Sequence, residues 1–243
     1  MMGIKSRTVA LIYRFFSVVV VFFGLLLSSG ILEGKMEYNL FIYFTYQSNI
    51  WCLIFFVFLI IETLKDLKNK GRIGFSTVSP LIRGEVMISI MLTHLVYHNI
   101  LAPHKFKMNP NFKCSLIYWL QDVLVHYVTP LLTVLDYLLF CKKNSFLSFH
   151  PFVWLSLPII YIIVVFIIAE YIPAIPYKDS RYPYFFLDID LLGTKNVIKY
   201  IVGLTFGLIV FAYMLVFFDW FINFEQKKSN ILGNEKMGKL NVD

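Results

Sequence analysis

The stretch LPIIYIIVVFIIA, residues 157–169, decides the fold. It contains no charged residue, and a helix of about 20 such residues crosses the ~30 Å hydrocarbon core of a bilayer. Working outward, five further apolar stretches of sufficient length occur. The six predicted spans cover roughly residues 8–29, 40–62, 81–101, 116–140, 149–172 and 197–222. The sequence therefore predicts an all-α, polytopic integral membrane protein with six transmembrane helices.

Composition separates the chain from ordinary soluble domains. Of its 243 residues, 58% are hydrophobic and only 15% are charged, whereas about one quarter of a soluble domain is charged. The formal net charge of +7 could indicate nucleic-acid binding, but the basic residues lie between the apolar stretches. Basic residues in such places set the orientation of the spans and contact lipid headgroups. We therefore expect membrane lipid as the partner, and no nucleic acid.

The Lys and Arg residues are divided unequally between the two ends of the predicted spans. Fourteen lie on the side that carries both termini, and eight lie on the other side. Because the cytoplasmic side carries the excess, we expect a multi-pass protein of the cell membrane with both termini in the cytoplasm. Residues 1–223 would form one six-helix transmembrane domain. Residues 224–243, rich in Lys, Asn and Gly, would form a polar, disordered cytoplasmic tail.

Two polar residues occur at depths where apolar residues are expected. Thr45 lies five residues inside the outer end of the second span and His126 ten inside that of the fourth, which corresponds to depths of about 8 and 15 Å. A hydroxyl and an imidazole in one slab of membrane are the parts of an activated nucleophile. Alternatively, both side chains hydrogen-bond neighbouring helices, as polar residues of membrane helices commonly do.

Neighbouring residues could support this pair. Asp122 precedes His126 by four residues, so both lie on one helical face and the carboxylate can orient the imidazole. Ser48 and Asn49 follow Thr45 by three and four residues and are expected to flank the same groove. The Asn49 amide could stabilise an oxyanion there, although interhelical packing explains it equally well.

Two histidines raise the possibility of a metal site. His94 and His98 on the third span stand four residues apart and present two ring nitrogens on one face. A catalytic zinc site needs three protein ligands, and His126 or Asp122 would supply the third. A zinc-dependent intramembrane hydrolase is therefore an alternative, whereas the threonine mechanism needs no metal and no cofactor. The cysteines show no paired spacing and are expected to be structural: Cys52, Cys114 and Cys141.

Charged residues in the predicted cytoplasmic half are expected to pair and to hold the helices in register. They are Arg14, Glu62, Arg83, Glu85, Asp136 and Asp219. At the opposite end, the loop before the sixth span is long and rich in aromatic residues, which is typical of a lid or of an interfacial anchor. If the loop is a lid, Asp188 and Asp190 would lie near the mouth of the site.

Four stretches carry a resemblance to a known family: YFTYQSN (43–49), LVHYVTPL (124–131), LDYLLF (135–140) and YPYFFLD (182–188). Over roughly residues 8–222 the chain resembles a bacterial family of six-helix integral membrane proteins of the Pr-six-Pr type. That family is distantly similar to the androgen-induced, FAR-17a-like membrane proteins of animals, which are intramembrane threonine hydrolases of hydroxy fatty acid esters. The resemblance implies Thr45 as the nucleophile and His126 as the general base.

We therefore expect an intramembrane hydrolase of lipid substrates, specifically fatty-acid esters, with Thr45 as nucleophile and His126 as base in the outer half of the bilayer. The expected supporting or orienting residues are Asp122, Ser48, Asn49, His94 and His98. The alternative from a different class is a non-catalytic membrane transporter or lipid-binding protein that uses the same polar pocket.

Overall fold

The computed structural model describes residues 3–34, 36, 38–76, 78–104, 115–171, 174–175 and 180–240. Within these ranges the regular elements are helices and no strand is formed, which confirms the all-α prediction. Five helical stretches are long and apolar enough to cross a membrane, as expected of an integral membrane protein. They are Arg7–Ser28, Pro80–His104, Leu116–Phe140, His150–Tyr171 and Thr194–Glu225.

The main helices are α1 (Arg7–Ser28), α2 (Phe44–Lys70), α3 (Pro80–Val96), α5 (Leu116–Val123), α6 (Thr129–Phe140), α8 (Ser156–Tyr171) and α10 (Thr194–Leu240). The short ones are η1 (Ile31–Glu33), η2 (Tyr38–Ile42), α7 (His150–Val153), η5 (Phe185–Leu187) and α9 (Ile189–Leu192). Two π-helices extend the main helices. η3 (Tyr97–Leu101) continues α3, and η4 (Leu124–Val128) joins α5 to α6.

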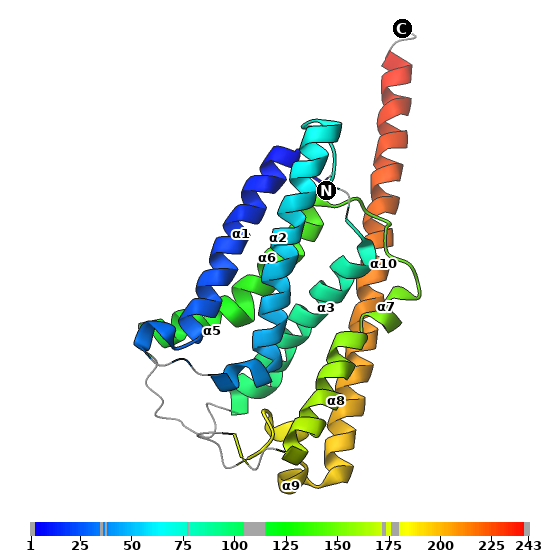
Figure 1. The fold of residues 1–243 in the computed structure, drawn as a ribbon. Coiled ribbons are helices and arrows are strands. Elements are labelled where there is room, and N and C mark those ends of the chain that lie inside the picture. Colours follow the sequence, from blue (N-terminus) through cyan, green and yellow to red (C-terminus); the bar gives the residue numbers. More distant parts are fainter. Residues whose placement is uncertain are drawn as a thin grey trace.

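The main helices form an antiparallel bundle in which α8 and α10 lie together on one side (Figure 1). The helix α2 is not among the five candidate spans, yet it lies antiparallel to α1 and packs along it (Figure 1). Its first turns contain the polar residues Thr45, Gln47, Ser48 and Asn49. Both chain ends lie at the same end of the bundle (Figure 1).

The start of α1 is tied to the loop between α2 and α3. The Ser6 side chain caps the helix by accepting from Val9 N. The buried guanidinium of Arg7 donates to four carbonyl oxygens of the loop, those of Lys70, Gly71, Ile73 and Phe75. Gly74 has φ +129°, and a Cβ there would lie 2.5 Å from Arg7 Nη2, so this close approach requires glycine.

An ion cluster inside the bundle links α1, α3 and α6. Arg14 Nε lies 2.7 Å from Asp136 Oδ1, and Arg83 Nη1 lies 2.6 Å from Asp136 Oδ2. The side chains of Arg14 and Asp136 are 0% and 1% exposed. Arg14 also bonds the hydroxyls of Thr63 and Ser76. Three of the six charged residues expected to pair thus do so with one another. Glu85 instead accepts from Ser156 Oγ, and Asp219 accepts from the Tyr137 hydroxyl.

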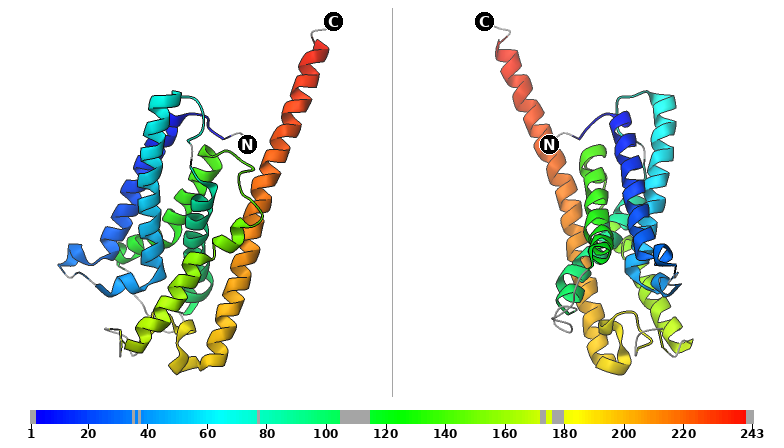
Figure 2. Two further views of the ribbon diagram at one scale, coloured as in Figure 1. Left: turned by 45° about the vertical axis from the view of Figure 1, so that its right-hand side comes forward. Right: turned by 90° about the vertical axis from the view of Figure 1, so that its left-hand side faces the viewer.

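The last helix, α10, includes most of the segment predicted as a tail. It continues without interruption to Leu240 and projects beyond the bundle (Figure 2). The segment after Asn223 contains several good helix formers, including Glu, Gln, Lys, Leu and Met. These residues extend a helix that the membrane-spanning segment has already nucleated.

Candidate functional site

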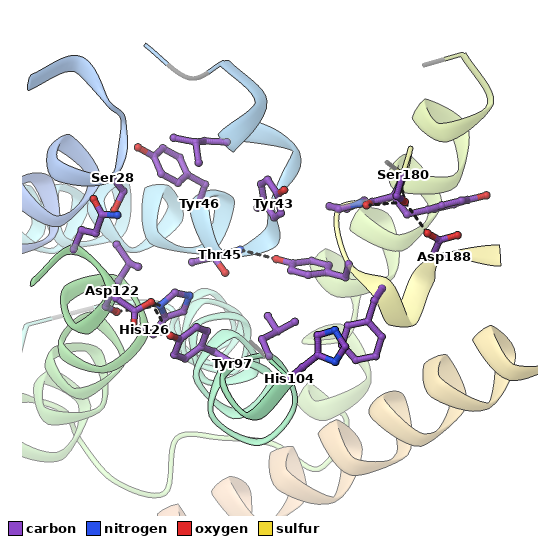
Figure 3. A pocket seen from close by; sticks show the side chains of 18 of the residues that line it. Ser28, Tyr43, Thr45, Tyr46, Tyr97, His104, Asp122, His126, Ser180 and Asp188 are labelled. Carbon is purple, nitrogen blue, oxygen red and sulfur yellow. Dashed lines mark hydrogen bonds and ion pairs between the residues drawn. The ribbon is translucent and has the colours of Figure 1, made fainter. Parts of the chain in front are cut away.

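A cavity of about 950 Å³ is lined by the first residues of α2, and the start of α2 lies at the end of the bundle opposite the chain termini (Figure 1). Helices α2, η3, α5 and η4 and the segment 180–191 line it, and we call it the main cavity. Thr45 on α2 and the pair Asp122 and His126 on the contiguous helices α5 and η4 all line it (Figure 3). The structure thus places at one cavity the three residues that the sequence predicted as nucleophile, orienting acid and base.

His126 is held by two neighbours. Its Nδ1 lies 3.0 Å from the carbonyl oxygen of Asp122 and 3.4 Å from Asp122 Oδ1. The ring stacks on Tyr97, with 3.6 Å between ring centroids and 12° between planes. The Tyr97 hydroxyl in turn bonds both Asp122 carboxylate oxygens. These contacts fix the position of the imidazole ring at the cavity wall.

The bonding pattern also assigns the proton on His126. A carbonyl oxygen only accepts hydrogen bonds, so the contact between His126 Nδ1 and the Asp122 carbonyl places the hydrogen on Nδ1. In the neutral ring Nε2 is then an acceptor. An imidazole with a free Nε2 at a cavity wall can remove a proton from a hydroxyl or from water.

Two π-helices shape this wall. Tyr97 begins η3 and His126 lies at the centre of η4, and π-turns within α-helices occur frequently at functional sites. In η4, Thr129 Oγ1 donates to the Leu124 carbonyl, five residues back. Helix α1 approaches closely here, because a Cβ on Gly24 would lie only 3.0 Å from Leu124 Cβ.

Thr45 lies in the first turn of α2. Its N–H donates to the Tyr184 hydroxyl at 3.4 Å, and its carbonyl accepts from Ser48 Oγ at 3.1 Å and Asn49 Nδ2 at 2.8 Å. Thr45 and His126 face the same cavity but form no direct hydrogen bond with each other.

Ser48 and Asn49 do not flank the main cavity, which corrects the expectation from spacing. Their side chains are 1% and 0% exposed and point between helices. Ser48 Oγ bonds Thr93 Oγ1 at 2.7 Å, and Asn49 Nδ2 donates to the Val125 carbonyl at 3.1 Å. The cavity ends at the level of Thr45, so the same face of α2 is covered by α3 and η4 one turn further on. Asn49 is therefore not placed to stabilise an oxyanion.

His94 and His98 likewise lie outside the cavity lining. His94 Nδ1 donates to the His126 carbonyl at 2.9 Å, and His98 Nδ1 bonds the Tyr127 hydroxyl at 3.2 Å. Across the part of the chain that the structure describes, no three His, Cys, Asp or Glu residues are grouped as a metal site requires. His94 and His98, the two residues of the zinc alternative, both make contacts between helices.

A smaller, apolar pocket of about 70 Å³ adjoins the site. It lies between α2, α3, α8 and α10 and shares Thr45, Leu101 and Tyr184 with the main cavity. Side chains such as Phe44, Leu92, Val96, Ile162, Phe186 and Leu204 line the remainder. Thr45 therefore stands between a roomy cavity that contains carboxylates and a narrow apolar one.

The segment 180–191 closes one side of the main cavity, with Tyr184 stacked on Phe186 at 5.1 Å. Asp188 bonds Ser180 Oγ and caps α9, and Asp190 pairs with Arg181 at 2.8 Å. The hydrogen bond from Arg181 lowers the pKa of Asp190. Both aspartates line the cavity, the position that the lid alternative predicted for them. Whether the segment is a lid or an interfacial anchor stays a prediction.

Sequence reasoning missed Tyr97 and Tyr184. Tyr97 stands between His94 and His98, and Tyr184 lies within the aromatic run of the predicted outer loop. The sequence predicted no role for Tyr97 and placed Tyr184 only in the loop expected to be a lid or an interfacial anchor. The hydroxyl contacts to Asp122 and Thr45 distinguish them in the structure.

Comparisons with protein-family models, with curated proteins and with solved structures found no match for this chain. The fold and the cavity define only a coarse class of protein: a helical protein with five helices long and apolar enough to cross a membrane, and with a mostly apolar cavity that carboxylate, hydroxyl and imidazole groups also line.

Proposed function

We propose that the protein is an intramembrane hydrolase of lipid esters, in which Thr45 is the nucleophile and His126 the general base. One observation carries the proposal: the two residues line one cavity, and His126 Nδ1 is bonded toward Asp122 so that Nε2 can accept a proton. The resemblance to the FAR-17a-like threonine hydrolases supports the same assignment. Membrane lipid is the source of the substrate.

The reaction follows the logic of an acyl-enzyme mechanism. Thr45 Oγ1 attacks the ester carbonyl carbon while His126 Nε2 takes the hydroxyl proton, directly or through one water. The tetrahedral intermediate collapses, and His126 returns the proton to the leaving alcohol. Water then hydrolyses the acyl-threonine with His126 as base, which regenerates the Thr45 hydroxyl and releases the acid. Tyr184, whose hydroxyl lies 3.4 Å from Thr45 N, is the candidate donor to the oxyanion.

The two cavities suit such a substrate. The main cavity has room for a large alcohol portion and a water molecule, since ligand pockets commonly measure about 300–1,000 Å³. The apolar pocket behind Thr45 accepts the hydrocarbon next to the ester carbonyl. Burial of apolar groups there favours binding without any charge on the substrate.

A serine- and threonine-directed fluorophosphonate probe tests the mechanism. Wild-type protein in membranes should be labelled at Thr45, and labelling should be lost in Thr45→Ala and His126→Ala. Ser48→Ala is the matched control, because it removes a nearby hydroxyl that lies outside the cavity. Equal labelling of wild type, Thr45→Ala and His126→Ala would contradict the mechanism.

A lipid-binding or transport protein is the second candidate. The size of the main cavity and the absence of a direct bond between Thr45 and His126 favour it. Mass spectrometry of lipids that copurify with the protein distinguishes the two functions. A binding protein retains intact lipid equally in wild type and Thr45→Ala, whereas a hydrolase accumulates intact ester only in the variant.

We further propose that α2 crosses the membrane in addition to the five candidate spans, which makes six crossings. Both termini would then lie in the cytoplasm of a cell-membrane protein. The excess of Lys and Arg on the terminal side supports this orientation. Single cysteines at Tyr38 and Ile73, which are 72% and 81% exposed at opposite ends of α2, test it. In a cysteine-free background, an impermeant maleimide should label position 38 in intact cells and position 73 only after permeabilisation.

A further inference from the structure

Two backbone carbonyls of η4 are bonded by side chains from other helices. The Val125 carbonyl accepts from Asn49 Nδ2 at 3.1 Å, and the His126 carbonyl accepts from His94 Nδ1 at 2.9 Å. Side chains of α2 and α3 thus hold the backbone at His126 and at the residue before it.

Pro130 explains why these carbonyls need partners. In α-helical geometry the N–H of residue 130 would face the carbonyl of His126, and in π-helical geometry it would face that of Val125. Proline has no N–H, so it can serve neither oxygen. In a membrane, neighbouring helices must satisfy backbone groups that a proline frees, and Asn49 and His94 do so here.

Asn49 links this wall of the cavity to the other. The same Nδ2 that bonds the Val125 carbonyl also donates to the Thr45 carbonyl at 2.8 Å. One fully buried amide therefore joins the backbone of Thr45 to the backbone next to His126. The distance between the side chains of Thr45 and His126 therefore depends on the Asn49 amide.

We propose that Asn49 and His94 are positioning residues that set the distance and orientation between Thr45 and His126. This inference rests on the proposed function, because the positions matter for chemistry only if Thr45 and His126 react together. Neither residue touches substrate. Their effect is geometric, and displacement of catalytic groups by about 1 Å can cost about 100-fold in rate.

Rates of fluorophosphonate labelling at Thr45 in the purified full chain test the inference. We expect His94→Ala and Asn49→Ala to label about 10- to 100-fold more slowly than wild type. His98→Ala and Asn99→Ala are the matched controls, because both residues lie on the same stretch of helix without bonding η4 carbonyls. They should label at the wild-type rate.

Rescue separates positioning from general damage to the fold. Asn places an amide N–H close to where His carries Nδ1–H, so His94→Asn should keep the bond and most of the rate. Pro130→Ala restores a backbone N–H facing the His126 carbonyl, and it should recover labelling in the His94→Ala background. Wild-type rates in both His94→Ala and Asn49→Ala, or no recovery in either rescue variant, would overturn the inference.

A second readout does not depend on catalysis. Diethylpyrocarbonate modifies accessible imidazoles, and mass spectrometry reports its rate at His126. The rate should change in His94→Ala and Asn49→Ala but not in His98→Ala. If the fluorophosphonate does not label wild type but the rate of His126 modification changes in the two variants, the proposed function is wrong, whereas Asn49 and His94 still position His126. If His126 reacts identically in all variants, the positioning fails.

Discussion

The Tyr97 hydroxyl donates to Asp122 with its oxygen 2.6 Å from Oδ2 and 2.7 Å from Oδ1, across two helices that both contain a π-turn. The same phenol ring covers one face of His126. A single residue therefore fixes both the acid and the imidazole before any ligand arrives. Groups held in this way need no reorganisation when charge develops.

Tyr97→Phe should reduce fluorophosphonate labelling while leaving the protein folded. The ring stack with His126 remains, but Asp122 loses a charge-assisted hydrogen bond worth about 1.5–3 kcal/mol, which corresponds to about 10- to 100-fold in rate. Tyr127→Phe is the control, because that hydroxyl bonds His98 outside the cavity. If Tyr97→Phe and Tyr127→Phe are labelled at the same rate, the Tyr97 hydroxyl has no role in orienting Asp122 for the reaction.

Asp136→Asn should destabilise the protein severely. It leaves Arg14 and Arg83 buried without their shared carboxylate, and loss of one member of a buried ion cluster costs about 3–5 kcal/mol. The melting temperature in detergent should fall by about 6–20 °C. Glu62→Gln breaks the exposed pair with Lys65 and should change it little. A melting temperature within 2 °C of wild type for Asp136→Asn, about 1 kcal/mol or less, would contradict this account.

Gly84→Ala should prevent stable folding or lower the melting temperature strongly. A Cβ at this position would lie 2.0 Å from Trp154 Cζ2, inside a ring that is itself completely buried. Overpacking of this kind costs about 1–3 kcal/mol and occasionally more. Gly203→Ala is the matched control, since nothing lies within 4 Å of its added methyl group. Comparable thermal stability of the two variants would show that α3 and α7 are not in contact.

Lys143 should make stability depend on pH. Burial lowers its pKa from 10.5 to about 8, so between these values the unfolded chain binds more protons than the folded one. The free energy of unfolding therefore rises with pH across this window. Below pH 8 the cost of burying the charged ammonium of Lys143 is fully present.

The difference in melting temperature between wild type and Lys143→Met measures this effect. As pH rises from 7.5 to 10, the melting temperature of wild type should increase relative to that of Lys143→Met. The same comparison with Lys142→Met, its exposed neighbour, should be flat. A flat or falling difference for Lys143→Met would show that the ammonium is solvated.

Sequence spacing anticipated part of this arrangement. A separation of four residues predicted that Asp122 and His126 share a helical face, and they lie 3.4 Å apart. Opposite charges at similar depth predicted the cluster around Asp136. Depth counting placed Thr45 and His126 in one slab, and both line the main cavity. These features follow from helical geometry, which the sequence expresses directly.

The π-helices could not be anticipated in the same way. Each inserts one residue into a turn and so rotates all following side chains by about 100° relative to an α-helix. Pro130 was a visible signal of a disturbed helix, but the sequence does not say which side chains would satisfy the freed carbonyls. For this reason the spacing placed Asn49 one turn from Thr45 but did not reveal that its amide bonds the Val125 carbonyl and does not line the main cavity.

The burial of basic residues changes what the Lys and Arg count means for the folded protein. Fourteen basic residues lie on the terminal side in the proposed topology, and four of those whose side chains the structure describes are buried: Arg7, Arg14, Arg83 and Lys143. Removing them leaves at most ten that can meet lipid headgroups, against eight on the other side. In the proposed topology, the charge asymmetry would therefore act mainly on the chain during insertion, before helices close over these residues. Depleting anionic lipid should disturb the topology of newly made protein more than it disturbs protein that has already folded.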